Sequence, residues 1–264
     1  PVGTAGWARA LGRGAALCVL IVGGLAILLA LRLIERPLRG PRRPWTARIT
    51  QSVCRGAFAI VGMRRRVHGR PIAGAGTMLA NHASWLDIFA LNAGARVTFV
   101  AKAEVAGWPG IGWLARANAA VFIRRERAAA GAEGGRIAAR LSEGALLVLF
   151  AEGTSSDGRR VLAFRPALLE ALMTAGAPVQ PVTIIYTAPP GRDARFYGWW
   201  GGMDLAPHLL SVLAAPRHGA VEVIHHPPLD PADFADRKAL ARAAEQAVRA
   251  GLAARLGSEV DTRP

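Results

Sequence analysis

The hydrophobic positions of the chain fall into one long uninterrupted run and a series of short ones. The long run, Gly14 to Leu31, holds eighteen residues without a charge between Arg13 and Arg32. At 1.5 Å per residue, a helix of this length spans about 27 Å, close to the roughly 30 Å of a bilayer's hydrocarbon core. The run is longer than the apolar part of a signal peptide. It therefore predicts an uncleaved N-terminal membrane helix, which either crosses the bilayer or lies in one leaflet.

A second helical pattern follows, from Thr46 to Met63. Its apolar residues recur at helical spacing: Ile49, Val53, Ala57, Ile60 and Val61. The pattern ends in three consecutive arginines, residues 64–66. Two interpretations fit: a helix lying on an anionic leaflet, and an ordinary packing helix with a solvated basic end.

From Pro71 onward, short apolar runs alternate with helical stretches, which is typical of an α/β fold. The runs that predict strands are Thr77–Ala80, Val97–Ala101, Ala120–Ile123, Leu146–Phe150, Val179–Ile185 and Ala220–Ile224. Residues 189–216, rich in Pro, Gly and Trp, predict no regular structure. Residues 233–256 predict a C-terminal helix with Leu240, Ala244, Val248 and Leu252 on one face. We therefore divide the chain into a membrane anchor with basic flanks (1–45), an amphipathic connecting helix (46–70) and an α/β domain (71–264).

The positive charge of the chain predicts a polyanionic partner, either nucleic acid or the anionic face of a membrane. Lys and Arg number 33 against 18 Asp and Glu, giving +15, and mean hydropathy is +0.26. No nucleic-acid-binding motif accompanies the charge, so we expect an anionic membrane surface and no nucleic acid. Two arginines precede the long apolar run and six follow it closely, which predicts a cytoplasmic position for the rest of the chain. Cys18 and Cys54 lack ligand spacing, so no metal site is expected.

The segment with the most chemical information is ANHASWLD, Ala80 to Asp87, between a predicted strand and a predicted helix. Ser84 with an acid three residues later is the pattern of a helix N-cap, so the helix is predicted to begin at Ser84. His82 then lies in the preceding turn, where its ring can fold back onto Asp87. A histidine oriented by a carboxylate keeps one nitrogen free as a general base. Taken alone, the segment equally fits a turn histidine beside a capping acid.

The second segment, residues 147–158 (LVLFAEGTSSDG), is again an apolar strand that runs into a turn of small residues. Exposed N–H groups and hydroxyls in such a turn can hold an anionic or carbonyl oxygen. By itself, the segment also fits a plain connection after a strand.

Together, these segments resemble the glycerolipid acyltransferases, the family that includes bacterial lysophosphatidate acyltransferase. Asn81-His82 and Asp87 resemble its N-H-x-x-x-x-D motif, and residues 150–156 (FAEGTSS) resemble F-P-E-G-T-R-S. Residues 121–125 (VFIRR) and 179–182 (VQPV) resemble two further blocks, in the same order. The resemblance covers about residues 71–185 and implies a mixed sheet flanked by helices.

The resemblance also implies a reaction without an acyl-enzyme intermediate. A base deprotonates the hydroxyl of a lysolipid, which attacks the thioester of acyl-CoA or of acyl carrier protein; these donors are substrates, and no cofactor is implied. His82 is then the base and Asp87 its partner. The positions that bind the acceptor or shape its site are Asn81, Ser84, Arg124, Glu152, Gly153, Thr154 and Ser155. The implied location is the cytoplasmic face of a bacterial inner membrane.

Two positions depart from the family motif: Ala151 replaces its proline and Ser155 its arginine. Without that guanidinium, the chain lacks a bidentate phosphate clamp, unless Arg159 or Arg160 replaces it. The segment from Glu152 to Gly158, with the later WWG and PHL sequences, also resembles the branch that acylates lyso-ornithine lipid, which has no phosphate. Lysophosphatidate and lyso-ornithine lipid therefore both remain candidate acceptors.

Two other classes of protein compete with this interpretation. The first is a non-catalytic membrane lipid-binding protein of the same fold, against which the intact His82 and Asp87 argue. The second is a hydrolase with Ser84 or Ser156 as nucleophile, although neither serine lies in a G-x-S-x-G sequence.

Overall fold

A mixed seven-stranded sheet forms the centre of the molecule in the computed structural model, which describes residues 2–40, 43–124 and 130–257. The strands are β1 (Arg64–His68), β2 (Gly76–Ala80), β3 (Val97–Lys102), β4 (Val121–Ile123), β5 (Leu146–Phe150), β6 (Val179–Thr187) and β7 (Ala220–His225). Their order across the sheet is β1-β7-β6-β2-β5-β3-β4. Neighbours are parallel except β6 and β7, which are antiparallel. The predicted fold class is thus confirmed.

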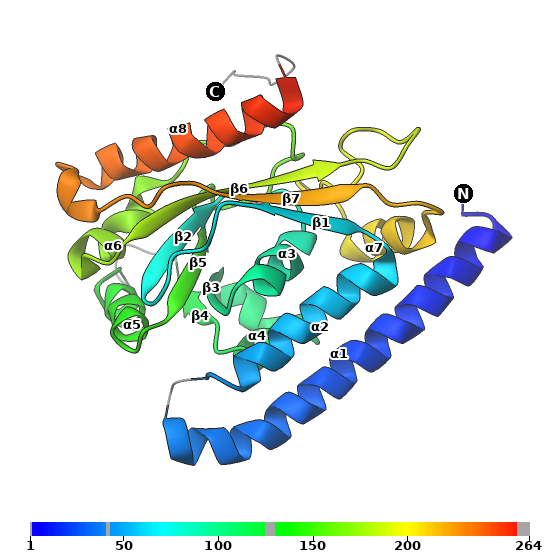
Figure 1. The fold of residues 1–264 in the computed structure, drawn as a ribbon, viewed down its shortest axis with the longest axis horizontal. Helices are drawn as coiled ribbons and strands as arrows, with labels where there is room; N and C mark the ends of the chain where they lie inside the picture. The colour runs from blue at the N-terminus through cyan, green and yellow to red at the C-terminus, as the bar shows by residue number, and fades with distance from the viewer. Residues whose placement is uncertain (1, 41–42, 125–129, 258–264) are drawn as a thin grey trace.

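Helices cover both faces of the sheet (Figure 1). One face carries α2 (Thr46–Val61), α3 (Leu86–Gly94) and α7 (Leu205–Ala214), and the other carries α5 (Ala130–Ser142), α6 (Glu170–Ala175) and α8 (Arg237–Leu256). The short helix α4 (Ile111–Ala117) lies between β3 and β4. Because side chains alternate along a strand, Met78 packs into the first layer and its neighbour Leu79 into the second. Both are fully buried, so the core lies on both sides of the sheet.

Two elements differ from the sequence prediction. The connecting helix was predicted over residues 46–70, but α2 ends at Val61, where Gly62 adopts a left-handed conformation (φ 82°). Residues 64–68 instead form β1, which pairs with β7 at the edge of the sheet. The second element is α7, which lies within the segment 189–216 for which no regular structure was predicted.

The C-terminal helix agrees with its predicted pattern. The four residues predicted to share one face are all fully buried against the sheet: Leu240, Ala244, Val248 and Leu252. The helix begins at Arg237, a few residues later than predicted. The side chain of Asp236 accepts a hydrogen bond from the Ala239 N–H (2.7 Å), which caps the first turn.

The N-terminal apolar run lies within α1 (Thr4–Arg39), the one described helix long and apolar enough to cross a membrane. In its apolar stretch of eighteen residues, only 6% is buried inside the protein. Both of its ends are nevertheless bonded to helices that pack on the sheet, α7 and α2. Near its start, the Arg9 side chain donates to the carbonyl of Ala214 at the end of α7 (2.9 Å). Near its end, the buried Glu35 carboxylate accepts from the Thr46 hydroxyl at the start of α2 (2.6 Å). The domain therefore lies alongside the whole length of α1 (Figure 1).

Candidate active site

His82 and Asp87 meet at the carboxyl edge of the sheet, as the sequence predicted. Strand β2 ends at Ala80 and α3 begins at Leu86, so His82 lies in the turn between them. Its Nδ1 is 2.7 Å from Oδ2 of Asp87. Asp87 is fully buried, whereas the His82 side chain is 20% exposed. With Nδ1 bonded to the acid, Nε2 is the nitrogen left for a proton transfer.

The Asp87 carboxylate accepts hydrogen bonds from four groups. Oδ2 accepts from the backbone N–H groups of Ala83 (2.8 Å) and Ser84 (3.0 Å) as well as from the His82 ring. Oδ1 accepts from the hydroxyl of Tyr186 (2.7 Å). A buried carboxylate is stable only with such donors, and here they also fix its orientation toward the imidazole.

Ser84 has a different place from the one predicted. The helix begins at Leu86, two residues later than expected, and the Ser84 hydroxyl accepts from the Leu86 N–H (3.3 Å). Asp87 reaches back to the Ser84 N–H, which is half of the expected capping arrangement. The side chain of Ser84 is fully buried, so it supports the turn.

Tyr186, on β6, is a member of the site that the sequence analysis missed. It is 99 residues from Asp87 in the chain, and it lies in an apolar run that predicts only a buried strand. Burial, together with the neighbouring Asp87, raises the pKa of its hydroxyl well above the ordinary value. Tyr186 therefore remains a neutral donor to the carboxylate, and we regard it as a positioning residue.

Replacing Tyr186 with phenylalanine is expected to lower kcat by about tenfold, with little change in KM. Loss of a hydrogen bond to a charged group costs on the order of 1.5–3 kcal/mol, and here the bond orients the acid that contacts the histidine. Steady-state kinetics measures the effect.

Tyr197→Phe provides the matched control. The Tyr197 hydroxyl is also buried and bonded, to the Gly219 N–H (3.1 Å) and to His218 (3.0 Å), but it does not contact Asp87. Both variants lose one bonded hydroxyl, so similar losses of stability are expected, whereas kcat falls only for Tyr186→Phe. Equal kcat values for the two variants would remove Tyr186 from the site.

Glu152 supports the same turn from the end of β5. Its carboxylate accepts from the backbone N–H of His82 (2.8 Å) and from that of Leu162 (3.0 Å). Burial raises the pKa of Glu152 to about 8, against which the two N–H donors act. The side chain is almost inaccessible to solvent, at 2% exposure, so its contacts are with the backbone of the turn. Gly153 follows with φ at 75°, the left-handed region that favours glycine.

The remaining predicted residues separate into buried and accessible ones. Asn81 is fully buried, and its amide donates to and accepts from the backbone of Ile184 (2.9 and 2.7 Å), which joins β2 to β6. Thr154 is exposed and Ser155 half-buried. Arg124 is exposed and follows β4, three strands from β2 at the same carboxyl edge. Its neighbour Arg125, part of the predicted motif block, lies outside the described residues.

Aromatic rings support the His82 imidazole from β5 and β3. Its ring stacks on Phe150, with ring centres 4.0 Å apart and planes at 15°. Phe150 in turn packs on Phe99 at 6.0 Å. Such stacking restricts the rotation of the imidazole and gives it an apolar wall.

Two further segments hold the turn through its backbone. The Ser156 N–H donates to the carbonyl of His82, and the Trp199 N–H to that of Ala83, both at 2.8 Å. The Trp85 indole donates to Nδ1 of His208 on α7 (3.0 Å), so this histidine helps to hold the turn. The segment 189–216 therefore covers the turn that carries His82.

Comparison with known proteins identifies the family. Residues 64–185 match the acyltransferase family. A lyso-ornithine lipid O-acyltransferase of Rhodobacter capsulatus is 51% identical over 259 residues, which cover 97% of this chain and 94% of the relative. The chain belongs to the acyltransferase family.

Two other proteins resemble this acyltransferase. A 1-acyl-sn-glycerol-3-phosphate acyltransferase of Neisseria gonorrhoeae is 32% identical over 176 residues, which cover 66% of this chain and 68% of the relative. The crystal structure of the 1-acyl-sn-glycerophosphate acyltransferase PlsC of Thermotoga maritima superposes with a TM-score of 0.63. That alignment covers 93% of this chain and 98% of the other at 22% identity, so it concerns the fold.

Proposed function

We propose that this acyltransferase moves a fatty acyl group from a thioester to the hydroxyl of a lysolipid, with His82 as general base. The observation that carries the proposal is the 2.7 Å contact between Nδ1 of His82 and the buried Asp87, which leaves Nε2 as the nitrogen for proton transfer on a side chain that is 20% exposed. A base in this position accepts the proton of an incoming hydroxyl, and the carboxylate stabilises the imidazolium that forms.

In the proposed reaction, the lysolipid oxygen forms a bond to the thioester carbonyl carbon as its proton passes to Nε2 of His82. The carbon–sulfur bond then breaks, and the imidazolium returns the proton to the leaving thiolate. The histidine ends each cycle neutral, and no acyl group is attached to the protein. Thr154 and Ser155 are the accessible members of the turn after β5, and we propose that they contact the acceptor.

We infer that lyso-ornithine lipid is the acceptor. The relative from Rhodobacter capsulatus, matched over nearly its whole length, carries that name. Ser155 supports the same choice, because a serine cannot provide the two-pronged contact that a guanidinium makes with a phosphate. Arg124 remains a candidate contact for the carboxylate of the ornithine group.

We further propose that α1 lies in one leaflet, on the cytoplasmic side of the inner membrane. A crossing helix would place its two ends on opposite sides of the bilayer, yet the ends of α1 are bonded to α7 and to α2, which pack in the same layer against the sheet. Apolar side chains along its length are exposed, among them Leu11, Val19, Val22, Ile27, Leu33 and Leu38. The excess of arginine supports contact with an anionic leaflet.

An assay of the purified full chain tests the function. Labelled acyl-CoA and acyl carrier protein thioesters are each offered with lyso-ornithine lipid and with lysophosphatidate. The proposal predicts label in the diacylated ornithine lipid, at a higher kcat/KM than in phosphatidate. Transfer to water would indicate a hydrolase, and the absence of turnover with binding of lysolipid would indicate a lipid-binding protein.

The variant Ser155→Arg is expected to raise the use of lysophosphatidate relative to lyso-ornithine lipid. A guanidinium at this position adds a bidentate donor for phosphate beside the proposed acceptor site. The ratio of the two kcat/KM values measures the change, and about a tenfold rise is expected for one charged hydrogen-bonded contact. Thr174→Arg, on the exposed surface of α6, adds the same charge elsewhere and should leave the ratio unchanged. An unchanged ratio in Ser155→Arg would contradict this role.

A further inference from the structure

A cavity of about 1200 Å³ lies at the opposite edge of the sheet from His82. Strands β2, β3 and β5 are parallel, so their amino ends all meet at this edge while their carboxyl ends form the candidate active site. The walls come from the turn before β2 (residues 71–74), the starts of β3 and β5, the end of α5 and the connection between α1 and α2. None of the residues of the candidate active site contributes to its walls.

The described walls of this cavity are strongly basic. Four arginines line it: Arg39, Arg43, Arg96 and Arg140. The acidic lining residue is Glu143, whose carboxylate is paired with Arg140 at 3.0 Å. The positive charge of the other three arginines is therefore not balanced by an acid on the cavity wall. Such a surface attracts an anion.

Arg43 provides a buried hydrogen-bond donor for that anion. One of its terminal nitrogens is buried and has no hydrogen-bond partner among the described residues, while its Nε contacts the Thr46 hydroxyl at 3.4 Å. Burial and the neighbouring Arg32 and Arg140 lower the pKa of Arg43 to about 10, against the opposing effect of Glu35, so the guanidinium is still charged at neutral pH. A buried cationic donor without an acceptor is costly, and an anion in the cavity would supply the acceptor.

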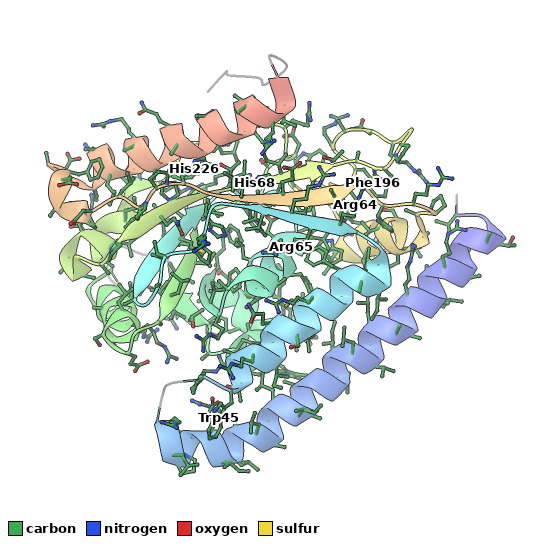
Figure 2. All side chains as sticks on the ribbon, viewed as in Figure 1. Trp45, Arg64, Arg65, His68, Phe196 and His226 are labelled. Carbon is green, nitrogen blue, oxygen red and sulfur yellow. The ribbon has the colours of Figure 1, made fainter. Side chains whose placement is uncertain are left out.

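The surroundings of the cavity indicate what kind of molecule carries the anion. Leu38 lines the cavity at the end of α1, and Leu33 and Ile34 nearby are exposed by 79% and 58%. Arg39 lies over the ring of Trp45, 5.8 Å from its centre. Figure 2 shows Trp45 at the turn between α1 and α2. Apolar side chains next to Trp and Arg are typical of the boundary between hydrocarbon and headgroups. An amphipathic molecule can therefore place its anionic group in the cavity and its acyl chains along α1.

We propose that this cavity binds the phosphate of an anionic phospholipid, separately from the acyl acceptor. Arg43 and Arg96 hold the phosphate oxygens, and the apolar end of α1 contacts the acyl chains. The bound lipid fixes this end of the domain on the leaflet. The proposal rests on the membrane placement of α1 proposed above, but not on the identity of the acceptor or on the role of His82.

Calorimetric titration of the detergent-solubilised full chain with dihexanoyl phosphatidylglycerol tests the proposal. Saturable binding of one lipid is expected, weakened about tenfold or more in the double variant R43Q/R96Q, which loses two charged donors. The control R36Q/R48Q removes the same charge from the same end of the molecule. Both of its arginines are exposed and lie outside the cavity wall, so it should bind as the unmodified chain does.

Several results would overturn the proposal. Equal weakening in the two double variants would indicate diffuse attraction by charge, and equal affinity for dihexanoyl phosphatidylcholine would exclude selection of an anionic lipid. Inorganic phosphate binding as tightly as the lipid would make the cavity a site for a soluble anion. If R43Q/R96Q fails to fold, the single variant R96Q, whose side chain is exposed, must still weaken binding. Acyl transfer in detergent is expected to be normal in R43Q/R96Q, which distinguishes this site from the proposed reaction.

Discussion

Replacing His82 with alanine is expected to lower kcat for acyl transfer by about 10²-fold or more, the typical contribution of a general base. Nε2 of His82 is the proposed acceptor of the lysolipid proton, and alanine has no group that can take it. The turn should persist, because the hydrogen bonds from Ser156 and to Glu152 involve the backbone of residue 82 and not its side chain. Its carbonyl still accepts from Ser156, and its N–H still donates to Glu152. Initial rates with lyso-ornithine lipid measure the effect.

Two controls separate loss of chemistry from loss of structure. The circular dichroism spectrum and the membrane-bound fraction of His82→Ala should equal those of the unmodified chain. His226→Ala removes an imidazole that contacts the Thr183 hydroxyl at 2.7 Å on β6 and does not contact Asp87, so its kcat should be close to normal. A His82→Ala variant that retains full turnover would remove this residue from the mechanism.

The central strands could be predicted from the sequence because each is a short apolar run between helices. Strand β1 could not be predicted in this way. Residues 64–68 are arginine-rich, and β1 lies at the edge of the sheet, where one side has no neighbour and charged side chains reach solvent. Its pairing with β7 joins residues more than 150 positions apart. No local pattern signals a partner at that separation.

The site shows the same division between local and distant contacts. The contact of His82 with Asp87 depends on a spacing of five residues across one turn, so it could be predicted. Tyr186 reaches the same carboxylate from β6, and its place depends on the order of the strands. The sequence motif also cannot tell whether a residue faces a substrate or the backbone. Asn81 and Glu152 were expected to bind the acceptor or to shape its site, and each is buried and bonds backbone groups.

These buried bonds have a common consequence for the turn that carries His82. The Glu152 carboxylate accepts a hydrogen bond from the N–H of His82, and the N–H of Ser156 donates to the His82 carbonyl. The N–H of Trp199 donates to the carbonyl of Ala83. Two segments distant in sequence, the turn after β5 (residues 152–156) and the loop that holds Trp199, thus fix one short stretch of backbone. A general base must be held within a fraction of an ångström of its working position, and such a shell of hydrogen bonds provides that precision. Much of the motif therefore serves to position the imidazole.

Asp87→Asn is expected to lower kcat by about 10²- to 10⁴-fold, a range whose upper end is known for the equivalent change in serine proteases. An asparagine offers one oxygen and one NH2 group in place of two oxygens. If the oxygen replaces Oδ2, it still accepts from His82, but no negative charge stabilises the imidazolium. If the amide is reversed, its NH2 group meets the three donors that now converge on Oδ2. Either orientation impairs the base, and the second also destabilises the turn.

The comparison of single and double variants decides whether the two residues act together. His82→Ala/Asp87→Asn should be no slower than His82→Ala, because an acid that acts through the histidine has no further role once the histidine is gone. Asp157→Asn, an acid in the neighbouring loop that pairs with Arg160 at 3.9 Å, serves as the matched control with near-normal kcat. Melting temperatures show whether each variant is folded under assay conditions. If the two losses multiply in the double variant, Asp87 acts independently of His82, and the carboxylate is then a structural cap of the turn.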